Sequence, residues 1–363
     1  MAKSQLREAL LHLSQHSVNS VQNGIKFTNW DEYMHIDRPI ESKLITRMDS
    51  IDQEGGGIIL LVGSAGDGKS HLISRIKQMS DWSDDCFYND ATASSSPRKT
   101  AIDTLKESLT EFKDANLHST SQKLVLAINL GKLNALIDDE EFKQEYKEIV
   151  TAAAPIFDDD DTTPPSGTKR VRIIMFTYEQ IFEFYPNNDA VIPTDSQFLS
   201  AILNKITSQD TSNPFYTAYK EDIVNGVSKK DPVLLNFELL CVPEIRHTIV
   251  MTIIEAIIRY KLVITPREFL DFIFSIMVPP KYDVYKEKTD FFESLMPSLF
   301  YCGVESLLQK AISRLDPLKQ SSTEHDRQLS VLFTSYSIPT SYLDVDAQSV
   351  LPEEMLARTN EFY

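Results

Sequence analysis

The chain has 363 residues, of which 42% are hydrophobic and 25% are charged, a length and composition that predict a soluble globular protein of about two or three domains. Its formal net charge of −17 argues against a protein that coats DNA or RNA through clustered lysines and arginines, so we expect any DNA contact to be made through partner proteins. No apolar run is long enough to span a bilayer and residues 1–8 lack an apolar signal core, so we expect a cytoplasmic protein with no membrane contact.

Residues 1–50 are predicted to form an N-terminal helical segment that leads into the first strand. Residues 4–17 place apolar side chains on one helix face, and a second helix is expected from Glu41 to Met48. Residues 29–40 connect the two, and three consecutive glycines then interrupt the chain at 55–57. By analogy with other phosphate-loop folds, we expect the connecting segment to lie near the nucleotide base.

Residues 63–70 fit the phosphate-loop (Walker A) pattern G-x-x-x-x-G-K-[ST] at every fixed position. The apolar run at 58–62 predicts a buried strand before it, and the apolar spacing within 71–79 predicts a helix after it. In this order, loop amides and the helix N-terminus face an anion, Lys69 reaches the β- and γ-phosphates, and the Ser70 hydroxyl is a Mg²⁺ ligand. The flanking strand and helix disfavour a chance match in a surface turn. The sequence therefore predicts a site for a nucleoside triphosphate, with ATP and Mg²⁺ as cofactors, formed by Gly63, Ser64, Ala65, Gly66, Asp67, Gly68, Lys69, Ser70 and His71.

Three further strands are expected downstream, at 85–88, 123–129 and 171–178. A helix beginning at Ser96-Pro97 and another over 140–153 alternate with them. Strands that alternate with helices predict an α/β fold with a parallel sheet flanked by helices, in the P-loop NTPase class, over residues 51–190.

Beyond about residue 190 the periodicity becomes helical and no strand-like alternation is convincing. The expected helices lie at 195–207, 231–242, 244–260, 266–277 and 303–314. They predict a mostly helical C-terminal domain over residues 191–363. Four of its arginines are candidate γ-phosphate sensors or inter-subunit fingers, although a surface or salt-bridged position is the commoner role of an arginine: Arg246, Arg259, Arg267 and Arg314.

ATP hydrolysis also needs an acid that holds Mg²⁺ and a group that orients the attacking water. Asp90, at the end of the second strand, is the first candidate for both catalysis and the metal site beside Ser70, with a simple turn residue as the alternative. Asn129 ends the third strand, where it either orients a water or sits in a tight Asn-Leu-Gly turn. Glu179, after the fourth strand, is the third candidate, and its alternative is the start of a solvated helix face.

Neither the cysteines nor the histidines show the spacing of metal ligands. Cys86, Cys241 and Cys302 are far apart, so we expect reduced thiols and neither a disulfide framework nor a zinc–cysteine site. The seven histidines are expected to be structural or surface residues.

Five short motifs together resemble the DptF family, a subunit of the DNA phosphorothioation-dependent restriction system. They span residues 33–40, 63–72, 89–92, 127–131 and 267–272, and the resemblance covers about residues 5–280. It implies a P-loop ATPase-like subunit of a bacterial antiphage defence complex, working with partners that include a helicase-like protein against DNA without sulfur in its backbone. Only residues 63–71 carry over as nucleotide-binding residues.

Two hypotheses of function follow. The first is an ATP-hydrolysing subunit of that complex, and the second is a nucleotide-binding regulatory or scaffold subunit with little or no intrinsic hydrolysis. A small-molecule kinase is disfavoured because the helical region shows no lid-like arginine cluster. The sequence leaves the oligomeric state open.

Overall fold

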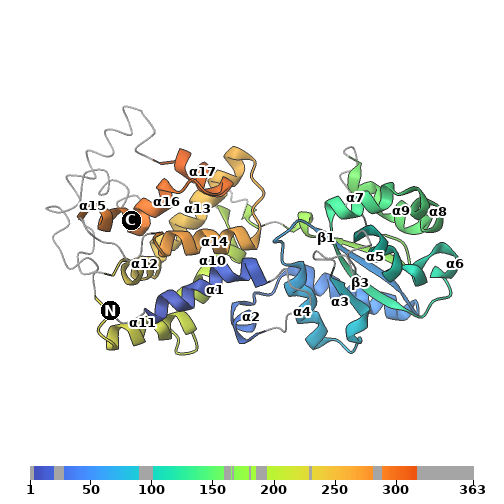
Figure 1. Ribbon diagram of the computed structural model, residues 1–363, viewed down its shortest axis with the longest axis horizontal. Helices are drawn as coiled ribbons and strands as arrows, with labels where there is room; N and C mark the ends of the chain where they lie inside the picture. The colour runs from blue at the N-terminus through green and yellow to red at the C-terminus, as the bar shows by residue number, and fades with distance from the viewer. Residues whose placement is uncertain are drawn as a thin grey trace. The chain divides into compact units, whose positions relative to one another are not determined.

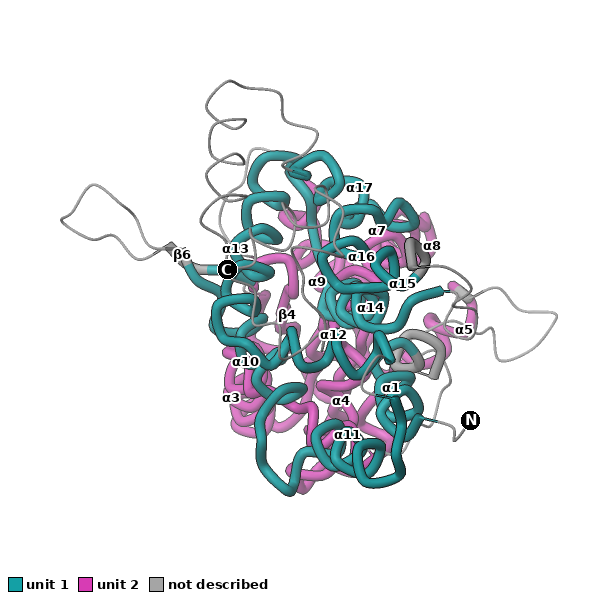
Figure 2. Tube along the Cα trace, turned by 90° about the vertical axis from the view of Figure 1, so that its left-hand side faces the viewer, with its two compact units in different colours: residues 1–16, 181–363 teal, residues 17–180 magenta. Residues whose placement is uncertain are grey.

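The structure, a computed structural model, describes residues 4–19, 28–89, 101–158, 165, 167–179, 181–184, 194–228, 231–280 and 288–316. The chain divides into two compact units, one of residues 1–16 and 181–363 and the other of residues 17–180 (Figure 2). Of the N-terminal segment expected over residues 1–50, the first helix, α1 (Gln5–Asn19), begins in the former unit, while α2 (Asn29–Met34) and α3 (Pro39–Gln53) belong to the latter.

A four-stranded, all-parallel sheet forms the centre of the unit of residues 17–180. Its strands run in the order β2-β3-β1-β4, where β1 is Gly57–Gly63, β2 is Phe87–Asn89, β3 is Lys123–Asn129 and β4 is Val171–Met175. In the register, Gly57 lies opposite Lys123 and Gly63 lies opposite Asn129. Every residue of β1 is buried, as expected for a central parallel strand covered on both faces. The predicted α/β class with a parallel sheet is therefore confirmed.

Helices cover both faces of this sheet (Figure 1). Ile59 and Leu61 point to one face, where α3 and α4 (Lys69–Met79) pack, and Ile58 and Leu60 point to the other. That second face is covered by α5 (Ala101–Ser108), α7 (Leu130–Asp138), α8 (Glu140–Glu145) and α9 (Lys147–Ala153). Short turns of helix complete the unit: η1 (Asp84–Cys86), η2 (Thr110–Phe112), α6 (Asp114–Leu117), η3 (Ala154–Phe157) and η4 (Phe176–Tyr178).

Several predicted boundaries were wrong. The second strand begins only at Phe87 because residues 84–86 form the η1 turn, and the fourth strand ends at Met175 because residues 176–178 form η4. The helix predicted over 140–153 is broken at Tyr146, whose φ of −128° and ψ of 45° are not helical. The helix start predicted at Ser96-Pro97 lies outside the described residues.

The unit of residues 1–16 and 181–363 is helical in its described part, apart from a short antiparallel pair of β5 (Glu183–Phe184) with β6 (Thr194–Asp195). Five of its helices correspond to predicted ones: α10 (Gln197–Thr207), α12 (Pro232–Leu240), α13 (Pro243–Tyr260), α14 (Pro266–Met277) and α17 (Leu307–Arg314). Three were not predicted: α11 (Pro214–Val224), α15 (Lys288–Glu293) and α16 (Met296–Cys302). The start of α1 joins this unit because the buried Asp222 carboxylate accepts hydrogen bonds from the Ser4 hydroxyl and the Gln5 amide, both at 2.7 Å.

Candidate functional site

The glycine-rich loop joins the carboxyl end of β1 to the first residue of α4. Gly66 and Gly68 have φ values of 90° and 95°, in the left-handed region that glycine adopts without steric cost. No side chain caps the N-terminus of α4, which starts at Lys69. The first turn of this helix is therefore open to an anionic acceptor, which the aligned amides and the helix dipole favour.

The loop is held in a tight conformation by its own residues. The Asp67 carboxylate accepts a hydrogen bond from the Ser64 amide, and the Lys69 ammonium reaches across the loop to the Ser64 carbonyl at 2.5 Å. A Cβ on Gly63 would lie 2.5 Å from Asp67 Oδ2 and 2.9 Å from the Phe176 Cβ. Glycine is therefore required at position 63 for close packing as well as at positions 66 and 68 for backbone conformation.

Arg38, just ahead of α3, lies against the same loop. Its Nη1 donates to the Asp67 carbonyl at 2.9 Å, and its guanidinium carbon lies 5.2 Å from the centre of the Phe176 ring. Burial lowers the pKa of Arg38, and the carboxylates of Glu179 and Asp67 act in the opposite direction. Arginine nonetheless stays protonated in proteins, so Arg38 brings a permanent positive charge to the loop beside Lys69. Arg38 was not among the residues predicted for this site.

Ser70 is contacted from the end of the edge strand. The Asn89 side-chain amide donates to the Ser70 hydroxyl at 2.8 Å. Asn89 ends β2, so the parallel strands bring it to the same edge of the sheet as the loop. Asp90, the predicted acid of the metal site, lies outside the described residues.

Asn129 lies at the end of β3, directly beside the strand that carries the loop. Its side-chain oxygen accepts from the Lys132 amide at 2.8 Å and so caps the N-terminus of α7. The Asn-Leu-Gly sequence is thus the start of a helix rather than the tight turn considered as the alternative. Among the described residues, β3, the strand beside β1, thus ends in a polar amide side chain, that of Asn129.

Glu179 follows the η4 turn and is not part of a solvated helix face. Its side chain is only 8% exposed, and its Oε1 lies 2.5 Å from the Lys43 ammonium of α3. Its charge also acts on Arg38. The structure therefore places Glu179 in a charged group with Lys43 and Arg38 on one side of the glycine-rich loop.

Three candidate arginines, Arg246, Arg259 and Arg314, contact carbonyls, a carboxylate or a ring within the helical region. Arg246 donates to the carbonyls of Leu240 and Cys241 at 3.2 and 2.7 Å. Arg259 pairs with Glu255 one helical turn earlier, at 2.7 Å, and the Arg314 guanidinium lies 5.4 Å from the centre of the Tyr260 ring. These contacts fit the alternative of surface and salt-bridged residues.

Comparison with models of known protein families, with curated proteins and with solved structures gave no match to this chain. Among the helices of the described ranges, none is long and apolar enough to cross a membrane. The most informative arrangement remains the loop of residues 63–70 with its flanking strand and helix.

Proposed function

We propose that this protein binds ATP with Mg²⁺ at residues 63–71, as the nucleotide-dependent subunit of a DNA phosphorothioation-dependent restriction complex. One observation carries the nucleotide site. A loop with two left-handed glycines leads from a central parallel strand into a helix without a side-chain cap, and the first two residues of that helix are Lys69 and Ser70. This combination supplies the amides, the ammonium and the hydroxyl that a triphosphate and its cation need.

The sheet topology supports the same site. In the order β2-β3-β1-β4, the connection from β1 runs to β2 on one side of the sheet and the connection from β3 runs to β4 on the other, so the connections leave these two neighbouring strands in opposite directions. In open α/β sheets, ligands bind at the carboxyl ends of the strands where the strand order reverses in this way. We therefore include the P-loop NTPase fold in the proposal.

The residues around the loop have complementary roles in it. Loop amides and the N-terminus of α4 donate to phosphate oxygens, while the Lys69 ammonium exchanges the Ser64 carbonyl for the β- and γ-phosphates. Arg38 adds a second positive charge and holds the loop through the Asp67 carbonyl. The Ser70 hydroxyl is the group that would ligate Mg²⁺, and Asn89 orients it. Bound Mg²⁺ would neutralise phosphate charge.

Whether the nucleotide is hydrolysed separates our two hypotheses. An ATP-hydrolysing subunit requires an acid near Ser70, for which Asp90 and Glu179 are the candidates. The regulatory alternative is favoured by Asn129, because an amide that caps α7 beside β1 cannot accept a proton from water. Glu179, in turn, is already paired with Lys43.

The restriction complex is proposed from the motif resemblance to the DptF family. In this proposal the protein is cytoplasmic and acts with other restriction subunits, including a helicase-like protein. The net charge of −17 supports DNA contact through those partners rather than through this chain, because phosphate binding requires clustered positive charge.

The nucleotide site is tested by titrating the purified protein with ATP and Mg²⁺ in a calorimeter. Lys69→Ala should weaken binding by up to about 100-fold, since a charged hydrogen-bond donor is worth up to ~3 kcal/mol. Lys77→Ala, in the last turn of the same helix, is the matched control and should bind as the native chain does. Unchanged affinity in Lys69→Ala would exclude this loop as the site.

Turnover is tested separately by phosphate release, with and without partner subunits and DNA. Release that is lost in Lys69→Ala and in Asp90→Asn supports the hydrolysing subunit. Micromolar ATP binding with no phosphate release under any of these conditions supports the regulatory subunit instead.

A further inference from the structure

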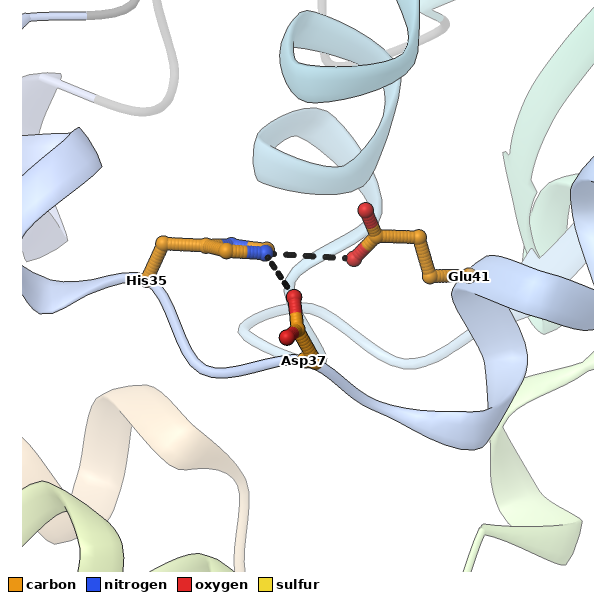
Figure 3. Close-up of side chains that lie close together, drawn as sticks. All are labelled: His35, Asp37 and Glu41. Carbon is orange, nitrogen blue, oxygen red and sulfur yellow. Dashed lines mark hydrogen bonds and ion pairs between the residues drawn. The ribbon is translucent and has the colours of Figure 1, made fainter.

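A histidine and two carboxylates converge between α2 and α4, where the chain enters α3 (Figure 3). His35 directly follows α2 as its C-cap, Asp37 lies in the connection, and Glu41 is the third residue of α3. The Nε2 of His35 lies 3.1 Å from Asp37 Oδ1 and 3.2 Å from Glu41 Oε2. Ligand atoms of the three residues all lie within 4.8 Å of one another, and this is the one such group within the described residues.

These separations fit the ligand shell of a small divalent cation. Bonds of ~2.0 Å from Zn²⁺ to nitrogen and oxygen place neighbouring ligands of a tetrahedron about 3.3 Å apart. The two distances from His35 Nε2 are within a few tenths of an ångström of that value. One imidazole nitrogen carries at most one hydrogen, yet two carboxylate oxygens approach it. A cation on the nitrogen lone pair would satisfy both carboxylates at once.

The burial of His35 and Glu41 gives an energetic reason for a cation at this group. The side chains of His35 and Glu41 are each only 10% exposed, and a buried carboxylate is costly unless its charge is balanced. Arg75 approaches Glu41 Oε1 only to 4.0 Å through its Nε, which is a weak contact for that purpose. Asp37, in contrast, is 92% exposed, so the group has a ligand on the solvent side through which an ion can enter.

The second nitrogen of His35 is oriented by His71. His35 Nδ1 lies 3.0 Å from His71 Nε2, and the two rings stack with their centres 5.3 Å apart. A histidine that binds a metal through one nitrogen commonly donates the other N–H to a fixed partner, which sets its tautomer and ring orientation. His71 is the third residue of α4, immediately after Lys69 and Ser70.

We propose that His35, Asp37 and Glu41 bind one divalent transition-metal ion, with the chemistry of Zn²⁺, at a site separate from the Mg²⁺ site of Ser70. His71 is a positioning residue for it. Imidazole nitrogen with carboxylate oxygen is a donor set that Zn²⁺ accepts, whereas Mg²⁺ prefers oxygen ligands and water. The ion fixes the segment of residues 35–41 against the first turn of α4, next to the glycine-rich loop.

The test uses the full chain, stripped of metal with a chelator and then titrated with Zn²⁺ alone in competition with a chromophoric chelator. The native chain should bind one equivalent. His35→Gln and Glu41→Gln should weaken binding by more than about 100-fold, and His71→Phe by about 10- to 100-fold as the orienting partner. His118→Gln is the matched control and should leave the affinity unchanged, since His118 also lies 3.0 Å from a carboxylate, that of Glu148, but belongs to no group of three ligand residues within the described part of the chain.

Asp37→Asn keeps the test decisive if the buried variants fold poorly, because that side chain is on the surface. It should lower Zn²⁺ affinity at least tenfold while circular dichroism stays native. Absence of a stoichiometric Zn²⁺ equivalent in the native chain, or native affinity in Asp37→Asn and Glu41→Gln, would overturn the proposal.

The proposals of a metal site and of a nucleotide site can be tested independently of each other. Lys69→Ala should lose ATP binding and keep its Zn²⁺ equivalent, whereas Glu41→Gln should lose Zn²⁺ and still bind ATP measurably. A Zn²⁺ equivalent that disappears in Lys69→Ala would instead place the ion at the loop, and the assignment to His35, Asp37 and Glu41 would be wrong.

Discussion

Asn89 and Ser70 meet through a hydrogen bond of 2.8 Å from the side-chain amide to the hydroxyl, although they lie on different elements of the sheet unit. Ser70 is the second residue of α4 and Asn89 ends β2. The amide donor occupies one lone pair of the oxygen that we assign to Mg²⁺. The hydroxyl keeps a second lone pair, so Asn89 orients it without preventing coordination.

We predict that Asn89→Asp increases the affinity for Mg²⁺ in the presence of ATP. The substitution places a carboxylate beside the Ser70 hydroxyl with almost no change in shape. Two unit charges ~4 Å apart interact by about 1 kcal/mol in water, and thus a carboxylate and divalent Mg²⁺ by about 2 kcal/mol, so the Mg²⁺ midpoint should fall about thirtyfold. The measurement is ATP binding as a function of Mg²⁺ concentration. Asn89→Ala should raise the midpoint instead, and equal midpoints in the three proteins would separate Asn89 from the metal.

Gly63→Ala should weaken ATP binding and lower stability together. The new methyl group would lie 2.5 Å from Asp67 Oδ2 and 2.9 Å from the Phe176 Cβ, so the loop or η4 must shift. Overpacking of this kind costs about 1–3 kcal/mol. Urea unfolding and ATP titration measure the two effects.

Gly131→Ala is the control for this substitution. It adds the same methyl group in α7, where the nearest atom is 3.6 Å away, an ordinary contact. Both stability and ATP affinity should stay near native values. If Gly63→Ala behaves like Gly131→Ala, the tight packing of the loop against Asp67 has no consequence for binding.

Strands with long apolar runs were predictable from sequence, and short ones were not. β3 has the predicted bounds of 123–129, because its interior residues are all apolar and buried on both faces. β2 has only three residues, and the acidic residues before it form a 3-10 turn that apolar patterning does not distinguish from a strand. The break at Tyr146 was also missed, since apolar spacing continues across it from Phe142 to Ile149.

Of the residues at and around the loop, only those with a local sequence pattern were predictable. The glycine-rich pattern predicted a site at residues 63–70 because its spacing is local. Arg38 and Asn89 were not placed beside it, since their contacts depend on strand order and on how α3 packs. His35, Asp37 and Glu41 follow no standard ligand spacing, and only the bend between α2 and α3 brings them together. The sequence signal that could have predicted this group is the close spacing of His35 and Asp37 just before a helix whose first turn contains an acid, Glu41.

Cys241 should be unreactive in the folded protein at pH 8. Burial raises the pKa of its thiol to about 11, with a further upward contribution from Glu238 and an opposing one from Arg246. The thiolate, which is the reactive form, is therefore scarce. Cys302 is exposed and should react first with iodoacetamide, as peptide mapping after brief labelling would show. Rapid native-state labelling of Cys241 would contradict the raised pKa of its thiol.

The same shift predicts a dependence of stability on alkaline pH. Because the pKa of Cys241 is higher in the folded state than its ordinary value of 9.0, the unfolded chain loses this proton first as pH rises. The contribution to stability is fully present below pH 9 and is lost as pH rises toward 11. Cys241→Ala should remove this part of the decline, measured as the difference between the two proteins in urea unfolding at pH 8 and pH 10.5. Identical pH dependence in both would exclude a raised pKa.

Arg38→Met should weaken ATP binding while leaving the fold intact, because Arg38 links the segment before α3 to the loop. The substitution keeps an apolar side chain over the Phe176 ring but removes the donor to the Asp67 carbonyl and the positive charge. A loss of about 1–2 kcal/mol, or five- to thirtyfold in affinity, is expected for a charged hydrogen bond that acts through the loop.

Lys77→Met is the control, since Lys77 also places a cation over a ring, that of Phe87, at the other end of α4. Calorimetric titration with ATP and Mg²⁺ measures the ATP affinity of both variants. A loss in Arg38→Met alone assigns the effect to the loop, whereas equal losses in both variants would mean that general positive charge, and not the contact of Arg38 with Asp67, supports the triphosphate.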